Sequence, residues 1–432
     1  MKVCVLGLWH LGTVTSACLA SYGYDVVGLD HDKDLVKNLG KGQLPVFEPG
    51  LGDLVEKGLT KGRLCYSTDI KYSLKDTNVI WITFDTPVNE NDTADVEFVV
   101  KQITELYPHL PNGSIVLVSS QLPVGTTRHL KHLYDQKFSN RSVSFACSPE
   151  NLRLGSAISA FTQPERIVVG IINDADREIL KTLINPITNC IKWMSVESAE
   201  MTKHALNAYM AATVAFTNEV ATLCEAVGAD AKQVEVGLKS DQRVSPKAYL
   251  SPGAAFGGGT LGRDITFLSQ IAQNYKKSAY LINAVKKSNE AHLEWTYKKL
   301  STLLDGFHNK IITVLGLTYK PGTDTLRRSN SVDLCKKISE QGSQVHAHDP
   351  AVKTLPEELT NYIKLYSSPI SAMENASVLV IATEWPDYLE LDAQIVISQM
   401  NSPIVIDPNR FLADTLGSVS EIVYATVGKG II

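Results

Sequence analysis

The chain has 432 residues, more than one hydrophobic core usually serves, and its 44% hydrophobic and 20% charged residues are ordinary for a globular protein. Its 41 basic and 46 acidic residues give a formal net charge of -5, which excludes a general electrostatic attraction to nucleic acid or to an anionic membrane. Any binding of phosphate must therefore be local.

The cysteines and the N-terminus indicate in which cellular compartment the protein is expected. The seven cysteines are scattered, form no C-x-x-C pair and show no metal-site spacing with histidine. The chain runs from Met1 directly into a strand and a glycine turn, without the apolar core of a signal peptide. No apolar run approaches the roughly 18 residues of a membrane span. We expect a soluble cytoplasmic protein with reduced thiols, no bound metal, and no nucleic-acid or membrane partner.

The N-terminal part predicts a doubly wound sheet. A strand at Lys2–Leu6, a glycine turn, an Ala/Ser-rich helix and a strand at Asp25–Leu29 form a βαβ unit. Further short apolar runs, typical of parallel strands buried on both faces, lie at 79–84, 114–118, 143–146 and 167–171. We predict a Rossmann-like domain over 1–195.

A long helical pattern follows. Residues 196–227 are rich in Ala, Met, Leu and Glu, and the pattern stops at Gly228 as at a helix C-terminus. Such a helix would be about 45 Å long, which suits a connection between domains. With two more helical stretches up to about Asp305, it predicts a central helical domain over 196–305.

The last part predicts a second βαβ unit. A strand at 310–315 and a glycine turn precede a helix at 332–341 and a strand at 344–347. Later strands are expected at 378–382 and 404–406. The predicted fold class is α/β, with a second Rossmann-like domain at 306–432 joined to the first through the long helix and the helical middle domain.

The first glycine turn has a dinucleotide-binding pattern, Gly7-Leu8-Trp9-His10-Leu11-Gly12, with Asp30 at the end of the next strand. In such a turn the helix N-terminus holds the pyrophosphate and the acid binds the ribose hydroxyls. The acid favours NAD over NADP, because it repels a 2′-phosphate. Trp9 replaces the glycine that lets the backbone approach the pyrophosphate, so its indole must turn away or displace the cofactor. A purely structural turn is the alternative.

Short segments along nearly the whole chain carry a family resemblance. They are 45–51, 86–87, 122–127, 164–168, 316–324 and 383–385. Their order and spacing are similar to those of the nucleotide-sugar dehydrogenases, the UDP-glucose/GDP-mannose dehydrogenase family. The resemblance implies an NAD domain, a central domain with a dimer contact and a nucleotide-sugar domain. It therefore implies NAD as the cofactor, a nucleotide sugar as the substrate, and a homodimer.

The segment Ala255 to Asp264 reads A-F-G-G-G-T-L-G-R-D, where the family's active-site loop reads roughly G-F-G-G-S-C-F-P-K-D. Thr260 stands at the position of the nucleophilic cysteine. The resemblance implies that Phe256 and Gly257 contact the substrate and that Asp264 is the catalytic aspartate, acting with an ordered water. An aspartate between a loop and a helix also serves as an N-cap, and a threonine there also serves as a hydroxyl that holds the loop backbone.

Lys203 and Asn207 lie four residues apart, so they share one face of the predicted long helix. The resemblance implies that they line the active site and stabilise the developing alkoxide. A solvated lysine beside an incidental asparagine is the alternative.

The resemblance assigns further binding residues. Glu150 and Leu152 contact the substrate, and Glu150 also helps a water to hydrolyse the family's thioester intermediate. Arg243 reaches the sugar or phosphates of a neighbouring subunit, Lys320 holds the nucleotide sugar, and Arg327 holds the cofactor, as suits cations beside phosphate. Surface salt bridges are the alternative for these cations. The resemblance also assigns Thr86 and Pro87 to the cofactor, and Gln121 stands where the family has a threonine near the nicotinamide.

The departures from the family gather near the chemistry. Gln121 replaces a threonine, Leu154 a glutamate and Arg263 a lysine, and residues 326–331 depart from L-R-E-S-P-S. Because Lys203, Asn207 and Asp264 are retained, these changes favour a remodelled site over a decayed one.

Three functions remain open on the sequence. The first is NAD-dependent oxidation of a hydroxyl of a UDP-hexose, at C6 by resemblance, for polysaccharide or glycoconjugate synthesis. Its second step, to the uronic acid, normally needs a thiolate, and an unassisted threonine hydroxyl is a poor substitute. The second is oxidation of a ring hydroxyl to a keto-sugar, and the third is a nucleotide-sugar-binding pseudoenzyme.

Overall fold

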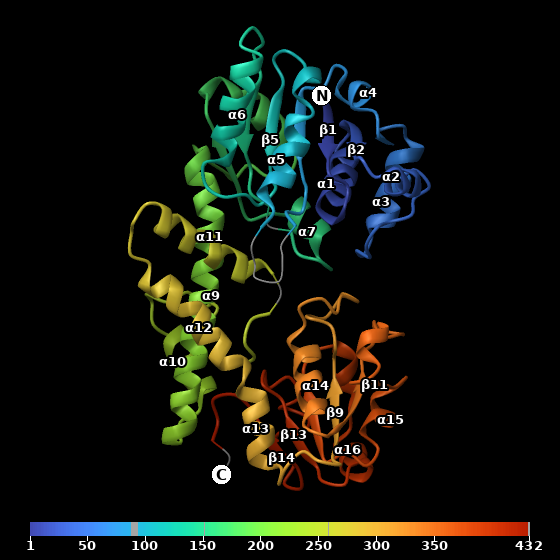
Figure 1. The fold of residues 1–432 in the computed structure, drawn as a ribbon, viewed down its shortest axis with the longest axis vertical. Coiled ribbons are helices and arrows are strands. Elements are labelled where there is room, and N and C mark those ends of the chain that lie inside the picture. Colours follow the sequence, from blue (N-terminus) through green and yellow to red (C-terminus); the bar gives the residue numbers. More distant parts are fainter. Residues whose placement is uncertain (88–93, 151, 258, 431–432) are drawn as a thin grey trace. The chain divides into compact units, whose positions relative to one another are not determined.

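The computed structural model describes residues 1–87, 94–150, 152–257 and 259–430. Their contacts divide the chain into two compact units, Met1–Ala205 and Leu206–Ile432, each described by itself below. Figure 1 labels many of the helices and strands of both units.

The first unit is built on an eight-stranded sheet in the order β3-β2-β1-β4-β5-β6-β7-β8. Its strands are β1 Lys2–Leu6, β2 Asp25–Leu29, β3 Leu64–Ser67, β4 Val79–Ile82, β5 Ile115–Val118, β6 Ser144–Cys147, β7 Ile167–Ile171 and β8 Ile191–Ser195. Its helices are α1 His10–Ser21, α2 Lys33–Leu39, α3 Leu51–Thr60, α4 Ile70–Leu74, α5 Val96–Thr104, α6 Thr126–Lys137, α7 Ala157–Thr162 and α8 Arg177–Ile184. This is the predicted Rossmann-like arrangement.

Alternating side chains bury both faces of this sheet. Val3 and Val5 of β1 belong to a hydrophobic cluster that includes Val14 of α1, whereas Cys4 and Leu6 belong to a second cluster with residues of α5 and α6. Continuous apolar strands are what a parallel sheet covered on both faces requires.

One strand pair differs from the prediction of an all-parallel sheet. β7 runs antiparallel to β6, with Ala146 opposite Ile171 and Cys147 opposite Gly170. In the described residues of the connection between these strands, the one helix is the six-residue α7, and the chain does not cross back along the sheet as a parallel connection would require. The other pairs of the sheet are parallel, as predicted.

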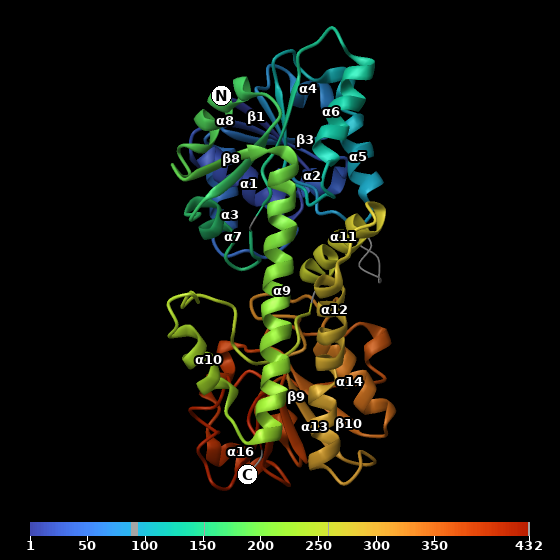
Figure 2. The same cartoon turned by 90° about the vertical axis from the view of Figure 1, so that its left-hand side faces the viewer.

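The predicted long helix is α9, Val196–Val227, with 32 residues. Figure 2 shows it as one continuous helix. Gly228 follows it with a φ of 75°, the left-handed conformation that commonly ends a helix. Its first residues belong to the first unit and its remainder to the second.

The second unit joins a helical region to a six-stranded parallel sheet in the order β11-β10-β9-β12-β13-β14. The helices are α10 Ala231–Lys239, α11 Thr260–Asn274, α12 Tyr280–Leu293, α13 Trp295–Leu303, α14 Asn330–Glu340, α15 Pro369–Met373 and α16 Ala393–Gln399. The strands are β9 Ile311–Leu315, β10 Gln344–His348, β11 Lys364–Leu365, β12 Val378–Ile381, β13 Ile404–Ile406 and β14 Val423–Ala425. Four helices stand before β9, where the sequence predicted two.

Short 3₁₀ helices complete the fold at Tyr107–His109, Asp174–Asp176, Glu357–Leu359 and Pro386–Glu390. Among the described residues, no helix combines the length and the apolar character needed to cross a bilayer. The predicted α/β class, with two Rossmann-like sheets and a helical middle region, is confirmed.

Candidate functional site

The glycine turn after β1 brings α1 very close to the strand. Gly7 has a φ of 92°, and its backbone N–H donates to Leu29 O at 3.0 Å. A Cβ on Gly12 would lie 1.8 Å from Gly7 O. Both positions therefore require glycine, which is what the close approach of a dinucleotide-binding helix to its strand demands.

Trp9 does not distort this turn. It precedes α1 with a φ of -71°, which lies outside the left-handed region that favours glycine. Its side chain is 51% exposed. The other residues of the motif point inward: Leu11 is buried in α1, and His10 Nε2 lies 2.9 Å from Glu48 Oε2.

Asp30 retains the capacity to bind a ribose. Its Oδ2 accepts the Leu8 N–H at 2.7 Å and its Oδ1 accepts the Asp32 N–H at 3.0 Å. A carboxylate oxygen has two acceptor positions, and the half-buried side chain still reaches solvent. With the N-terminus of α1 free of acidic side chains, the turn fits a dinucleotide with an unphosphorylated ribose.

Three further residues expected to bind the cofactor lie beyond the carboxyl ends of β4 and β5. Thr86 is buried, and its hydroxyl donates to Gln121 O at 2.8 Å. Gln121 is buried as well, whereas Pro87 is exposed. The structure therefore brings Thr86 and Gln121 together at the edge where α/β sheets bind their ligands.

Lys203 is held beside Glu150. Its Nζ donates to the backbone oxygen of Glu150 at 2.6 Å and lies 3.9 Å from the carboxylate Oε1. The Leu152 N–H donates to Oε2 of the same carboxylate at 2.6 Å, and Leu152 packs against the first unit's core. Three residues that the resemblance assigned to one site thus lie together.

Two buried side chains that the sequence did not indicate fix the start of α9. Glu200 accepts the N–H groups of Gly125 and Thr127 and the Thr127 hydroxyl at 2.6 to 2.9 Å, which caps α6. Burial raises the pKa of Glu200, and these hydrogen bonds oppose the rise. His204 Nε2 contacts Leu122 O at 2.9 Å. In the sequence, the only sign of these contacts was that the segment 122–127 matches the family.

In the second unit, Asn207 donates from Nδ2 to Oδ2 of Asp264 at 2.5 Å. Both side chains are buried, and Asp264 is 0% exposed. The N-cap of α11 is Gly259, so Asp264 lies inside the helix and the alternative of an N-cap is wrong. Its carboxylate instead holds a residue of the long helix.

Thr260 is the first residue of α11, and its side chain is exposed. Within the part of the chain that the structure describes, its hydroxyl makes no hydrogen bond. The alternative of a hydroxyl that holds the loop backbone is therefore not supported.

The loop before α11 is fixed by polar side chains from distant parts of the chain. Phe256 is held at both backbone groups by Asn289, with distances of 2.9 and 3.0 Å. The Gly253 carbonyl contacts His292 Nε2 at 2.8 Å, and burial lowers the pKa of that histidine. The same loop also bonds to Asn218, Asn330 and Asn409. These asparagines follow no local pattern, so sequence reasoning missed them.

Two of the departures from the family touch this loop. A Cβ on Gly259 would lie 2.4 Å from Nη1 of Arg328, and one on Gly257 would lie 3.0 Å from Nδ2 of Asn330. Arg328 and Asn330 belong to the segment 326–331, which departs from the family pattern. The glycines of the loop and the altered segment therefore fit each other sterically.

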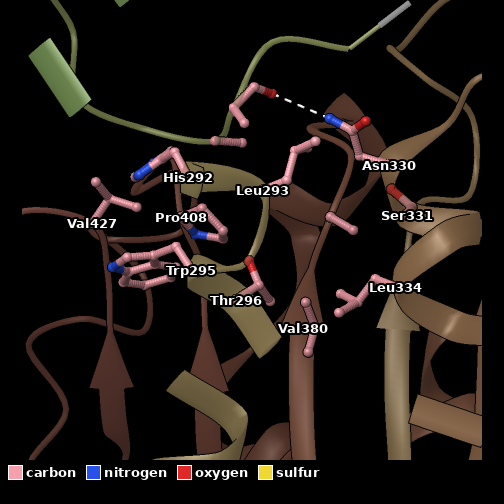
Figure 3. Close-up of a pocket in the computed structure, with 13 residues that line it drawn as sticks. His292, Leu293, Trp295, Thr296, Asn330, Ser331, Leu334, Val380, Pro408 and Val427 are labelled. Carbon is pink, nitrogen blue, oxygen red and sulfur yellow. Dashed lines mark hydrogen bonds between the residues drawn. The ribbon is translucent and has the colours of Figure 1, made fainter. Parts of the chain in front are cut away.

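A small cavity lies beneath the loop, at the carboxyl ends of β12, β13 and β14 (Figure 3). Its volume is about 60 Å³, room for a few water molecules. Its lining mixes apolar and polar side chains, among them His292, Trp295, Thr296, Ser331 and Val380. The dashed bond in Figure 3 joins Asn330 to the loop above the cavity.

The remaining predicted residues of the second unit lie on its surface. Arg243 has a side chain that is 89% exposed, and it pairs with both oxygens of Asp241 at 2.8 and 3.0 Å. The pairing lowers the pKa of Asp241 and raises that of Arg243. Lys320 Nζ lies 5.6 Å from the Tyr319 ring, and Arg327 is exposed.

A glycine turn closed onto a helix, an acid at the end of β2 and a second Rossmann-like sheet are typical of a dinucleotide-binding α/β protein. Comparison with known proteins makes the class specific. Residues 1–188, 197–291 and 313–414 match the NAD binding, central and UDP binding domains of the UDP-glucose/GDP-mannose dehydrogenase family. The chain belongs to this family and is an NAD-dependent oxidoreductase of the UDP-glucose 6-dehydrogenase type.

Individual relatives agree along the whole chain. UDP-glucose 6-dehydrogenase TuaD of Bacillus subtilis (strain 168) is 32% identical, over 99% of this chain and 93% of the relative. UDP-glucose 6-dehydrogenase of Rickettsia bellii is 32% identical over 100% of both. A UDP-glucose dehydrogenase structure from Pyrobaculum islandicum has a TM-score of 0.88 and 26% identity, covering 99% of this chain and 98% of that one.

Proposed function

We propose that this protein transfers a hydride to NAD from a hydroxyl of a UDP-hexose, at C6, and that Lys203, Asn207 and Asp264 perform that step. The observation that carries the proposal is the pair of contacts along α9, in which Lys203 joins Glu150 and Asn207 joins Asp264. Two relatives that are each 32% identical to the chain are named UDP-glucose 6-dehydrogenases, which supports UDP-glucose as the first substrate to test.

The first oxidation needs an alkoxide from which hydride can leave. The Lys203 ammonium and the Asn207 amide share a face of α9, and both supply N–H donors that stabilise an alkoxide more strongly than its parent alcohol. Asp264, through a water, takes the hydroxyl proton. NAD, when bound, accepts the hydride, so one alcohol and one NAD⁺ give one aldehyde, one NADH and one proton.

The second oxidation lacks an evident nucleophile. The exposed Thr260 hydroxyl has no base among its hydrogen-bond partners in the described residues, and a hydroxyl without a base is neither ionised nor strongly nucleophilic at neutral pH. Cys147 does not replace it, because burial raises its pKa well above the usual value. We propose that the reaction stops after one hydride, unless Glu150 activates water to hydrate the aldehyde.

NADH formed per sugar consumed tests this proposal, over a panel that includes UDP-glucose, UDP-N-acetylhexosamines and GDP-mannose. We expect one equivalent and a C6 aldehyde by NMR. Two equivalents and an acid would overturn the single-step proposal. A ring ketone would establish the keto-sugar alternative, and no NADH with any sugar that binds would establish a binding protein.

Variants separate the roles of the residues. Lys203→Met should lower kcat by about 10³-fold, because it removes the charge that stabilises the alkoxide. Lys192→Met, an exposed lysine on the adjoining strand β8, is the matched control and should leave kcat unchanged. Thr260→Ala should also leave kcat unchanged, and a large fall would give Thr260 a role in the first step.

We further propose a homodimer formed through α9. Tyr209, Phe216, Leu223 and Val227 are more than half exposed and recur at intervals of seven, seven and four residues, so they form one apolar stripe. Phe216→Lys should convert a dimer into a monomer in light scattering after size exclusion. Tyr280→Lys, at an exposed aromatic on α12, should leave the mass unchanged, and a monomeric wild type would contradict the proposal.

In such a dimer, Arg243 contacts the substrate of the partner subunit. Removing the Arg243 side chain should raise KM rather than lower kcat. The same proposal divides the domains at 195 and 305. It assigns contacts with the nucleotide sugar to Phe256, Gly257, Leu152 and Lys320, and a contact with the cofactor to Arg327. All seven cysteines are free thiols, which supports a reducing cytoplasm in which an oxidised UDP-sugar is made for polysaccharide or glycoconjugate synthesis.

A further inference from the structure

The Glu48 side chain joins the glycine turn at the start of α1 to the segment that leads into α7. It lies in the matching segment 45–51, and its side chain is buried at 2% exposure. Oε2 contacts His10 Nε2 at 2.9 Å and accepts the Gly155 N–H at 2.8 Å, while Oε1 accepts the Ala157 N–H at 2.8 Å. One carboxylate thus receives three hydrogen bonds from two segments more than 100 residues apart.

The first of these segments is the cofactor turn. His10 is the first residue of α1 and lies inside the dinucleotide motif. Because its ring is buried against Glu48, the position of the helix N-terminus depends on where the carboxylate lies. That N-terminus is the part of the turn that meets the pyrophosphate.

The second segment leads into α7. Ser156, the residue before this helix, makes no side-chain capping bond, and Glu48 takes over the task by accepting the N–H groups on either side of it. Upstream in the same segment, Leu152 donates to Glu150, whose carbonyl binds the Lys203 ammonium. The placement of Lys203 and of Glu150 therefore depends on the course of the chain from Leu152 to Ala157.

We propose that Glu48 is a positioning residue, and that the His10–Glu48 pair transmits dinucleotide binding to the segment from Leu152 to Ala157. Binding that fixes the α1 N-terminus fixes the carboxylate, and the carboxylate fixes the backbone N–H groups of Gly155 and Ala157. The consequence for catalysis rests on the proposed roles of Lys203 and Glu150. The coupling itself rests only on NAD binding.

Hydrogen exchange on the full chain tests the coupling, with and without saturating NADH. In the wild type, NADH should slow exchange at the amides of Gly155 and Ala157 at least about fivefold, the lower range of ordinary coupling between sites. His10→Phe keeps a ring but removes the donor, and it should lose that protection while NADH is bound. His10→Gln keeps an N–H donor and should restore it. His132→Phe, an exposed histidine on α6, is the control and should behave as wild type.

A second readout distinguishes coupling from simple loss of stability. In the wild type, the Kd for a UDP-sugar should fall at least about fivefold when NADH is present, and in His10→Phe the ratio should approach one. Full protection in His10→Phe, or none in a wild type that binds NADH, overturns the coupling. A wild type that binds NADH with protection but oxidises no sugar overturns the proposed function and leaves the coupling established.

Discussion

The glycine turns after β1 and β9 have the same backbone geometry, but the aspartates beside them have different hydrogen-bond partners. In the first unit, Gly7 N donates to the strand β2 at Leu29 O, and in the second, Gly316 N donates to His348 O of β10 at 2.8 Å. Both glycines have a φ of 92°. In each case an aspartate ends the second strand, so topology alone would predict two dinucleotide sites.

The aspartate of the second turn is already saturated. Asp349 is 2% exposed, and its Oδ2 accepts from Leu317 N, from both donors of Thr318 and from Trp385 Nε1 at 2.7 to 3.1 Å. Its Oδ1 accepts from Ala351 N. Asp30, by contrast, accepts two backbone bonds and remains partly exposed. The Asp349 carboxylate is therefore occupied by structural hydrogen bonds, whereas the Asp30 carboxylate keeps the open acceptor positions that the proposed ribose contact needs.

The largest expected effect comes from Gly12, which has no counterpart beside the second turn. Gly12→Ala places a Cβ 1.8 Å from Gly7 O and 2.7 Å from Thr83 Oγ1, so α1 must move away from β1. NADH should bind at least about 100-fold more weakly, a loss of roughly 3 kcal/mol, in a fluorescence titration of a variant whose circular dichroism is native.

The control is Gly52→Ala in α3, where nothing lies within 4 Å of the added Cβ. It should bind NADH as wild type does and gain slightly in stability from helix propensity. Binding by Gly12→Ala within about threefold of wild type, a difference under roughly 1 kcal/mol, would refute the need for close packing at this turn.

The two aspartates should respond in opposite ways to the same substitution. Asp30→Asn removes a charged acceptor from the ribose and should weaken NADH about 10-fold or more with a small change in thermal midpoint. Asp349→Asn turns an amide toward buried N–H donors and should cost about 1 to 3 kcal/mol of unfolding free energy. Its NADH affinity should stay unchanged. Equal losses of affinity in both variants would erase the distinction between an open and a closed carboxylate.

Sequence reasoning found the first turn because its requirements are local. Gly7, Gly12 and Asp30 act at fixed spacing along one βαβ unit, and the helical spacing of Lys203 and Asn207 placed both on α9. It did not find the exposure of the Trp9 side chain, which depends on the course of the backbone at the turn. Nor did it find the strands β3, β8, β11 and β14, which are not continuous buried apolar runs: β8 reads I-K-W-M-S and is only partly buried.

Other features were out of reach because their partners are far apart in sequence. The contact between Asn207 and Asp264 spans 57 residues, and the loop before α11 is held by asparagines from α9, α12, α14 and the end of β13. A buried amide that binds a distant backbone leaves no pattern in its own neighbourhood. The antiparallel direction of β7 also leaves no local pattern, because it follows from a connection that stays at the carboxyl end of β6.

Acid should weaken the second sheet more than the first along matching strands. Where β2 has Val27 and Leu29, β10 has His346 and His348, and burial lowers the pKa of both histidines. The unfolded chain, with a histidine pKa near 6.5, therefore takes up protons first as pH falls. Stability is complete above about pH 6.5 and is lost as pH drops toward the lower folded values.

Hydrogen exchange of the β10 and β2 amides at pH 7.5 and 5.5 measures this difference. The β10 amides should lose protection at pH 5.5 relative to those of β2. The double variant His346→Val and His348→Leu, which copies β2, should flatten the dependence on pH. An unchanged dependence would move its origin to other groups, such as His292.

The smallest expected effect concerns the cavity at the edge of the second sheet, the edge at which the first sheet has its cofactor turn. Val380→Ile adds one methylene toward this cavity, and it should raise the unfolding free energy by up to about 0.8 kcal/mol and the melting midpoint by about 2 °C. Val405→Ile, on the neighbouring strand β13 with a fully buried side chain in a different cluster, makes the same change without the space. It should cost about 1 kcal/mol or more through overpacking. If both variants destabilise alike, the cavity holds ordered water whose hydrogen bonds to Thr296 or Ser331 outweigh the added methylene.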